Sequence, residues 1–134
     1  MATLTKKDLM VGDFVCVTYE DGIQRFRKWT SLDFADEKIT NIQPIEITRD
    51  FLLRNSFKKL KNSTPTWRLI VGNVEILIRQ SNQYGEMTYC NLCYNPGDAT
   101  EVNFSGSLEF DRWLYIHDLQ HFCNMYDVEI DWKP

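Results

Sequence analysis

The hydrophobic pattern is clearest in the last third of the chain, where residues 113–126 contain no glycine or proline and repeat apolar positions at a helical period. At about 100° per residue, six apolar or aromatic side chains fall within one arc of roughly 120°. They are Tyr115, Ile116, Leu119, Phe122, Cys123 and Tyr126. A helix with such a stripe needs a sheet to pack on. His117 and His121 fall near the middle of the opposite arc, so the pattern predicts that both face water.

Alternating and β-branched runs predict strands in most of the remaining chain. The first hairpin runs from Phe14 to Trp29 and turns at Gly22, and a short strand over residues 39–45 follows it. In the second hairpin, Gly72-Asn73 suits a primed two-residue turn that places Val71 opposite Val74. Further strands are predicted over residues 87–94, 100–104 and 108–112, with a turn over residues 95–98 and the chain passing Gly106 between the last two.

A short helix is predicted over residues 47–57, where Thr48 can cap the first turn and Asp50 lies in it. Asn55 or Ser56 should end this helix in the left-handed conformation. Together these elements predict a single α+β domain over residues 1–134. It has an antiparallel sheet, an N-terminal SH3-like hairpin or partial barrel within residues 1–45, one short central helix, and a C-terminal helix packed on the sheet. Residues 46–134 supply the helices and the main sheet.

Composition supports a globular protein, with 43% hydrophobic and 25% charged residues in a chain of 134. The first residues carry charge with no apolar run behind them, which predicts no secretory signal, a cytoplasmic location and reduced cysteines. No apolar run approaches the ~20 residues that a membrane helix requires, so no membrane partner is expected. Charge is uneven: residues 1–67 carry 11 basic and 9 acidic residues, and residues 68–134 carry 4 and 10.

Three segments together resemble a family of small uncharacterised proteins that gut bacteria of the Bacteroides group encode, often in prophages and other mobile elements. The segments are Leu9-x-Val-Gly-Asp-x-Val15, Ile42-x-Pro-Ile-x-Ile-Thr-x-x-x-Leu52-x-x-Asn55-x-Phe57-Lys58 and Tyr115-Ile-His-x-Leu-Gln120. The resemblance implies a genomic setting and no activity, substrate or cofactor. Family members commonly carry Gly where this chain has Ser56, and Asn or another polar residue where it has His121.

Two patterns are candidates for metal or redox chemistry. His117 and His121 stand one helical turn apart and can both reach one metal ion, but no third ligand is marked, and an open surface is a poor place for hydrolysis. Cys90 and Cys93 lie in a run that alternates as a strand, which points their sulfur atoms to opposite faces. We therefore expect no cofactor, and a metal at the His pair only as a weak candidate.

Basic residues interleaved with aromatic ones are a third candidate site. The candidate binding residues are Arg25, Arg27 and Trp29 on one strand face, and Lys58, Lys59 and Lys61 elsewhere. Such a surface can meet phosphates and stack bases, although the net charge of −4 argues against it. Trp29, Trp113 and Trp132 have no assigned core face, and exposed aromatic residues mark partner surfaces. The sequence therefore favours a non-catalytic protein that binds another protein or itself, with nucleic-acid binding as the alternative.

Overall fold

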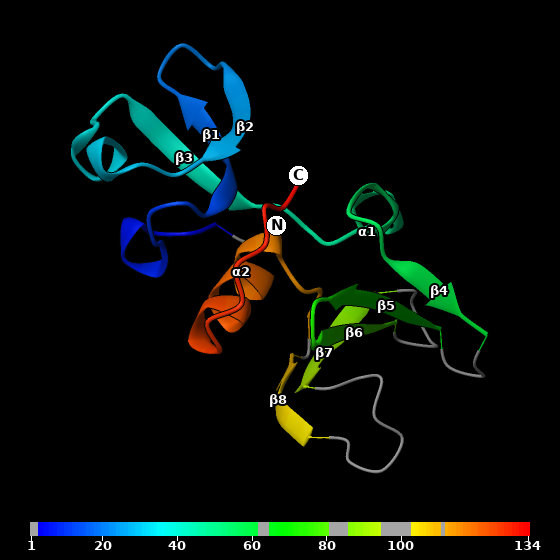
Figure 1. The fold of residues 1–134 in the computed structure, drawn as a ribbon. Helices are drawn as coiled ribbons and strands as arrows, with labels where there is room; N and C mark the ends of the chain where they lie inside the picture. The colour runs from blue at the N-terminus through cyan, green and yellow to red at the C-terminus, as the bar shows by residue number, and fades with distance from the viewer. Residues whose placement is uncertain (1–2, 62–64, 81–85, 95–102, 111) are drawn as a thin grey trace.

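Two antiparallel sheets organise the part of the chain that a computed structural model describes, residues 3–61, 65–80, 86–94, 103–110 and 112–134 (Figure 1). The N-terminal sheet has the order β2-β1-β3, formed by β1 (Phe14–Tyr19), β2 (Gln24–Lys28) and β3 (Ile39–Pro44). The large sheet has the order β4-β5-β6-β7-β8, formed by β4 (Lys58–Leu60), β5 (Thr66–Val71), β6 (Val74–Gln80), β7 (Met87–Tyr94) and β8 (Asn103–Glu109). The helices are α1 (Arg49–Arg54), α2 (Ile116–Met125) and the short 3-10 helices η1 (Lys6–Asp8) and η2 (Ser31–Ala35). The predicted α+β class is confirmed.

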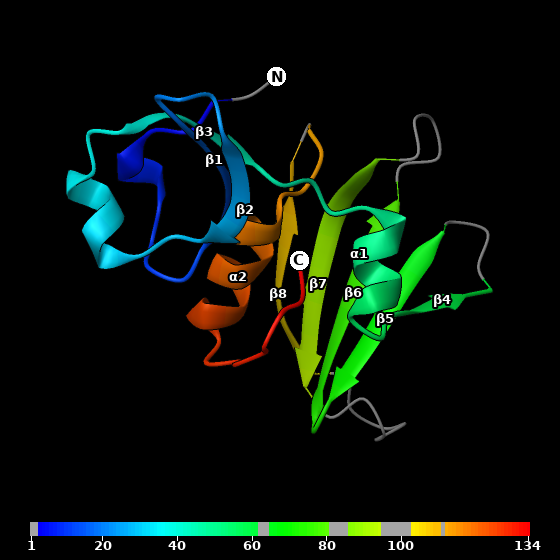
Figure 2. The same ribbon diagram turned by 90° about the horizontal axis from the view of Figure 1, so that it is seen from above.

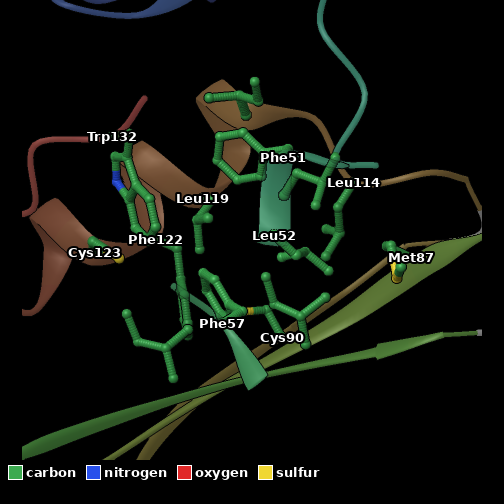
Figure 3. Packing of buried hydrophobic residues seen from close by; sticks show 14 of the residues in the cluster. Phe51, Leu52, Phe57, Met87, Cys90, Leu114, Leu119, Phe122, Cys123 and Trp132 are labelled. Carbon is green, nitrogen blue, oxygen red and sulfur yellow. The ribbon is translucent and has the colours of Figure 1, made fainter. Parts of the chain in front are cut away.

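The main hydrophobic core lies between the large sheet and both α-helices (Figure 2). Figure 3 shows Phe51 and Leu52 of α1 and Leu119 and Phe122 of α2 in one apolar layer with Cys90 of β7. The predicted stripe of the C-terminal helix is therefore its core face. At about 25 cal/mol per Å² of apolar surface removed from water, this layer is the main favourable term in folding.

Strand β1 is buried on both faces because it belongs to two cores. Phe14 joins the main core, while Val15 and Val17 point the other way into a smaller cluster. That smaller cluster consists of Leu9, Val15, Val17, Trp29 and Ile42, with Leu4, Tyr19 and Ile39 packed against it. The first hairpin is present and β3 extends it into an open three-stranded sheet separate from the large one. Its likeness to an SH3-like barrel stays a prediction.

Local sequence signals place α1 and the second hairpin as predicted. The Phe51 N–H donates to the Thr48 hydroxyl at 3.3 Å, so Thr48 is the N-cap, and Ser56 closes the helix with a φ of 67°. In the second hairpin, Val71 pairs with Val74 across the predicted turn.

The last two predicted strands, residues 100–104 and 108–112, are not separate elements in the described part of the chain, and their residues 100–102 and 111 lie outside it. Strand β8 runs from Asn103 to Glu109 through Gly106. A side chain at Gly106 would collide with the phenol of Tyr126, which follows α2. The glycine therefore makes room for a side chain from another element and does not mark a turn. The predicted turn over residues 95–98 lies outside the described residues.

Replacing Ser56 by Gly should stabilise the protein by about 0.5 to 1 kcal/mol, because Ser56 has a positive φ that costs an L-residue more than it costs glycine. Urea unfolding followed by tryptophan fluorescence measures this change. Ser56→Ala keeps the Cβ atom and is the matched control, which should give no gain. Equal stabilities for the Gly and Ala variants would contradict the role of the left-handed conformation.

Candidate functional site

Helix α2 lies between the two sheets, and Gln120 fastens it to the N-terminal sheet (Figures 1 and 2). The Gln120 Oε1 atom accepts a hydrogen bond from the Phe14 N–H at 2.8 Å, and its Nε2 atom donates to the Gly12 carbonyl at 2.8 Å. The amide thus satisfies a donor and an acceptor of the backbone just before and at the start of β1. Two of the three segments that carry the family resemblance meet at this contact.

Next to Gln120, His121 forms an ion-pair contact with Asp13. The imidazole Nε2 atom lies 2.7 and 2.8 Å from the two carboxylate oxygens, and the Met10 N–H also donates to this carboxylate at 2.8 Å. Asp13 is 2% exposed, so these partners replace the water that would otherwise hydrogen-bond its carboxylate. The hydrogen bond with Asp13 raises the pKa of His121 above its usual value, against the opposing effect of burial.

His117 is also buried, at 5% exposure, so the prediction that the His pair faces water is wrong for this residue. Its ring stacks on Tyr115 with centroids 5.7 Å apart and meets the His121 ring edge-on at 5.6 Å. Burial lowers the pKa of His117 below its usual value. Helical periodicity correctly identified the face of α2 that packs on the large sheet. Part of the opposite face, which was expected to face water, packs against the segment at the start of β1.

Asp118 and Arg112 fix the start of α2 beside these histidines. The Tyr115 N–H donates to the Asp118 carboxylate at 2.8 Å, and Arg112 pairs with the same carboxylate at 2.8 Å. The Arg112 guanidinium lies 4.2 Å from the centroid of the Tyr115 ring. A negative charge in the first turn suits the positive end of the helix.

We call Asp13, His117, Gln120 and His121 the joint, because Gln120 and His121 bind the segment at the start of β1 and His117 packs against His121. Within the described residues, no three His, Cys, Asp or Glu side chains form a group that could hold a metal ion. The arrangement can carry protons and fix two elements against each other. Metal binding by His117 and His121 alone stays a prediction.

The basic and aromatic candidates do not form one surface. Trp29 is 0% exposed and belongs to the smaller core, so the prediction that it stacks on a base or a partner is wrong. Trp132 is also buried in the main core, and the Trp113 indole N–H donates to the Ile47 carbonyl. Alternation along one strand puts Trp29 on the same face as two arginines, which suggested an exposed surface. The N-terminal sheet has a core of its own, however, and that core buries Trp29.

Arg27 of the same set is engaged within the molecule. Its guanidinium lies 2.6 Å from Asp33 and also donates to the Tyr19 hydroxyl. The hydrogen bond with Arg27 lowers the pKa of Asp33 to about 2. Arg25 remains exposed on β2, whereas Lys58, Lys59 and Lys61 are exposed on and just after β4, in the other sheet.

The four cysteines are free and buried. Cys90 faces the main core. Cys93 lies opposite Glu75 in the register of β6 and β7, on the other face of the large sheet. Burial raises the pKa of Cys123 to about 12 and of Cys90 well above its usual value. These thiols therefore behave as small apolar side chains.

A groove of about 420 Å³ lies between the N-terminal sheet, α1 and the chain end. Its lining residues are Phe26, Ile45, Glu46, Thr48, Phe51, Arg54, Ile116 and Pro134. Phe26 of β2 is 68% exposed at this groove. Phe26 is not among the binding residues predicted from the sequence, although its alternation with charged neighbours places it on the face opposite Arg25 and Arg27.

Comparisons of the chain with family models, curated proteins and solved structures found no match. In the described part of the chain, no helix has both the length and the apolar character needed to cross a membrane.

Replacing His121 by Asn should destabilise the protein by about 3 kcal/mol at pH 6, because it leaves the buried Asp13 carboxylate without its charged partner. The loss should shrink at higher pH. The pKa of His121 is higher in the folded than in the unfolded protein. The stability that this difference contributes is fully present below the unfolded pKa of 6.5 and disappears as the pH rises through the folded pKa of His121. Urea unfolding of wild type and variant from pH 6 to 9 measures this difference.

The double variant Asp13→Asn/His121→Asn is the control, since it removes the buried charge together with its partner. It should recover much of the loss. His117 has the opposite sign, because its lowered pKa makes stability fall as pH drops below 6.5. A destabilisation of His121→Asn that is the same at every pH would contradict the ion pair.

Proposed function

We propose that this chain is a non-catalytic protein-interaction domain that binds its partner through the groove beside Phe26. The observation that carries the proposal is a large aromatic side chain, mostly exposed, at the margin of an apolar groove. Exposed apolar surface costs free energy in water and is a common feature of partner sites. Among the residues that line the groove, the ionisable side chains are Glu46 and Arg54. These two side chains add charge to a lining that is otherwise mostly apolar.

The joint supports this proposal because it fixes one wall of the groove. Gln120 and His121 bind the turn that leads into β1, and β1 carries β2 with Phe26. The opposite wall comes from α1, which is held in the main core by Phe51 and Leu52. A groove with both walls held in place can bind with little loss of conformational freedom.

The family resemblance supports a setting for this interaction. In that setting the chain is a cytoplasmic accessory protein of a prophage or mobile element, and its partner is a protein of the bacterial host or of the same element. Nucleic-acid binding is the second candidate, favoured by the exposed Lys58, Lys59 and Lys61 and weakened by the burial of Trp29. It predicts binding that weakens steeply as salt rises.

Phe26→Ser should weaken partner binding by roughly 30-fold, the loss expected for a central aromatic contact. Size-exclusion chromatography with light scattering, at ~150 mM salt, tests mixtures with fractions of a Bacteroides-group lysate and with labelled DNA and RNA. Leu32→Ser is the matched control, because Leu32 is an apolar side chain, 83% exposed, that does not line the groove. It should leave binding unchanged.

A shift of a protein fraction that both variants retain would rule out the groove as the binding site. A shift with nucleic acid that disappears at higher salt would favour the second candidate instead.

A further inference from the structure

We propose that the partner enters as an extended acidic segment that adds a strand to the free edge of β2. This inference rests on the proposed protein-interaction function and names the chemistry of the partner. It combines three features of the described residues: an open strand edge, unpaired basic side chains along it, and the apolar groove beside it.

The open edge follows from the pairing of the N-terminal sheet. Strand β2 is at one margin of the order β2-β1-β3, and none of the other described strands pairs with its outer side. The Trp29 N–H donates to the Asp13 carbonyl and the Tyr19 N–H to the Ile23 carbonyl, so residues 23 and 29 direct their backbone groups toward β1. By alternation Arg25 and Arg27 do the same, and Gln24, Phe26 and Lys28 direct theirs outward.

The two edge strands of this sheet differ in how much of their outer side is covered by other segments. At the β3 edge, the Leu4 N–H donates to the Ile42 carbonyl at 2.9 Å, so the N-terminal segment covers part of that strand. At the β2 edge, the Lys28 carbonyl accepts a hydrogen bond from the Arg27 side chain at 3.0 Å, and the backbone groups of Gln24 and Phe26 remain for a partner. Such groups are a template for an added strand.

Charge selects the partner. Arg25 is exposed, and the Lys28 ammonium lies 5.2 Å from the centroid of the Phe14 ring without a carboxylate partner among the described ion pairs. These two residues are three positions apart and lie on opposite faces of β2. The residues that face them on an added strand would also be three positions apart, one on each face of that strand. Acidic residues at those positions would form cross-strand pairs with both cations.

The same charges argue against a second copy of this chain at the edge. An antiparallel pairing of two β2 strands centred on Phe26 would place Arg25 opposite Arg27 and Gln24 opposite Lys28. Like charges directly opposite each other destabilise a strand pair. Arg27 is already paired with Asp33, so a second copy offers Arg25 and Lys28 no acidic partner, whereas an acidic segment can pair with both.

The groove fixes the position of an apolar residue in that segment. Phe26 shares its face with Lys28, and this face borders the groove lined by Ile45 and Phe51. A residue paired with Phe26 would have its side chain on the same face, beside the groove. The preferred segment therefore has one apolar residue flanked by acidic ones, which is the opposite charge pattern to β2 itself.

The test uses a fluorescein-labelled peptide, Thr-Glu-Glu-Val-Glu-Glu-Thr, and a control peptide with Lys in place of each Glu. The acidic peptide should bind at least tenfold more tightly, as measured by fluorescence anisotropy at ~50 mM salt. On binding, the amide protons of Gln24 and Phe26 should become protected from hydrogen exchange measured by NMR, which contact with the groove side chains would not produce.

Gln24→Pro removes an outward N–H and blocks strand addition, and should weaken binding of the acidic peptide about tenfold. Proline is tolerated at such an edge position, and Gln24→Ala is the matched control that should bind normally. Unchanged thermal unfolding of both variants keeps the comparison valid, and Arg25→Ala provides a second variant that leaves the backbone intact.

Binding without amide protection, equal binding of the Lys peptide, or no binding would each overturn the acidic strand. If Phe26→Ser still abolishes capture of a host protein in any of those cases, the proposed function stands. If the acidic peptide does not bind and Phe26→Ser does not weaken capture of a host protein, the proposed function is overturned as well.

Discussion

The placement of α2 between two sheets is the constraint on which the rest of the structure depends. One face of the helix supplies Leu119 and Phe122 to the main core, and the other carries Gln120 and His121 to the start of β1. The N-terminal sheet packs on a small core of its own, and Phe14 joins it to the main core beside α2. Its attachment to α2 therefore decides where β2 and its free edge point.

The contacts at this attachment are polar, which gives them a different role from the apolar layer below. Apolar packing is tolerant of small shifts, whereas the two hydrogen bonds of Gln120 and the contact of His121 with Asp13 require one geometry. Burying Asp13 is costly, and the cost is offset only when α2 is in place. The joint thus sets the orientation of the N-terminal sheet relative to α2.

Patterns within one element were sufficient for much of the fold. The Thr48 cap, the pairing of Val71 with Val74 and the apolar stripe of α2 follow from local periodicity and turn chemistry. Gly106 led to a wrong prediction of two separate strands, because the reason for a glycine there is Tyr126, a residue 20 positions away. The candidate site was predicted less well: His117 and Trp29 are both buried by elements that no local pattern connects with them.

The sequence by itself determined which elements form, since backbone hydrogen bonding, capping and alternation act over a few residues. It also determined that Arg25 and Lys28 place positive charge on a short strand. Only the tertiary structure decided that the second face of α2 meets a sheet, that Asp13 meets His121 across 108 positions, and that β2 is an edge beside a groove. These are contacts between distant segments, whose pairing depends on how whole elements pack.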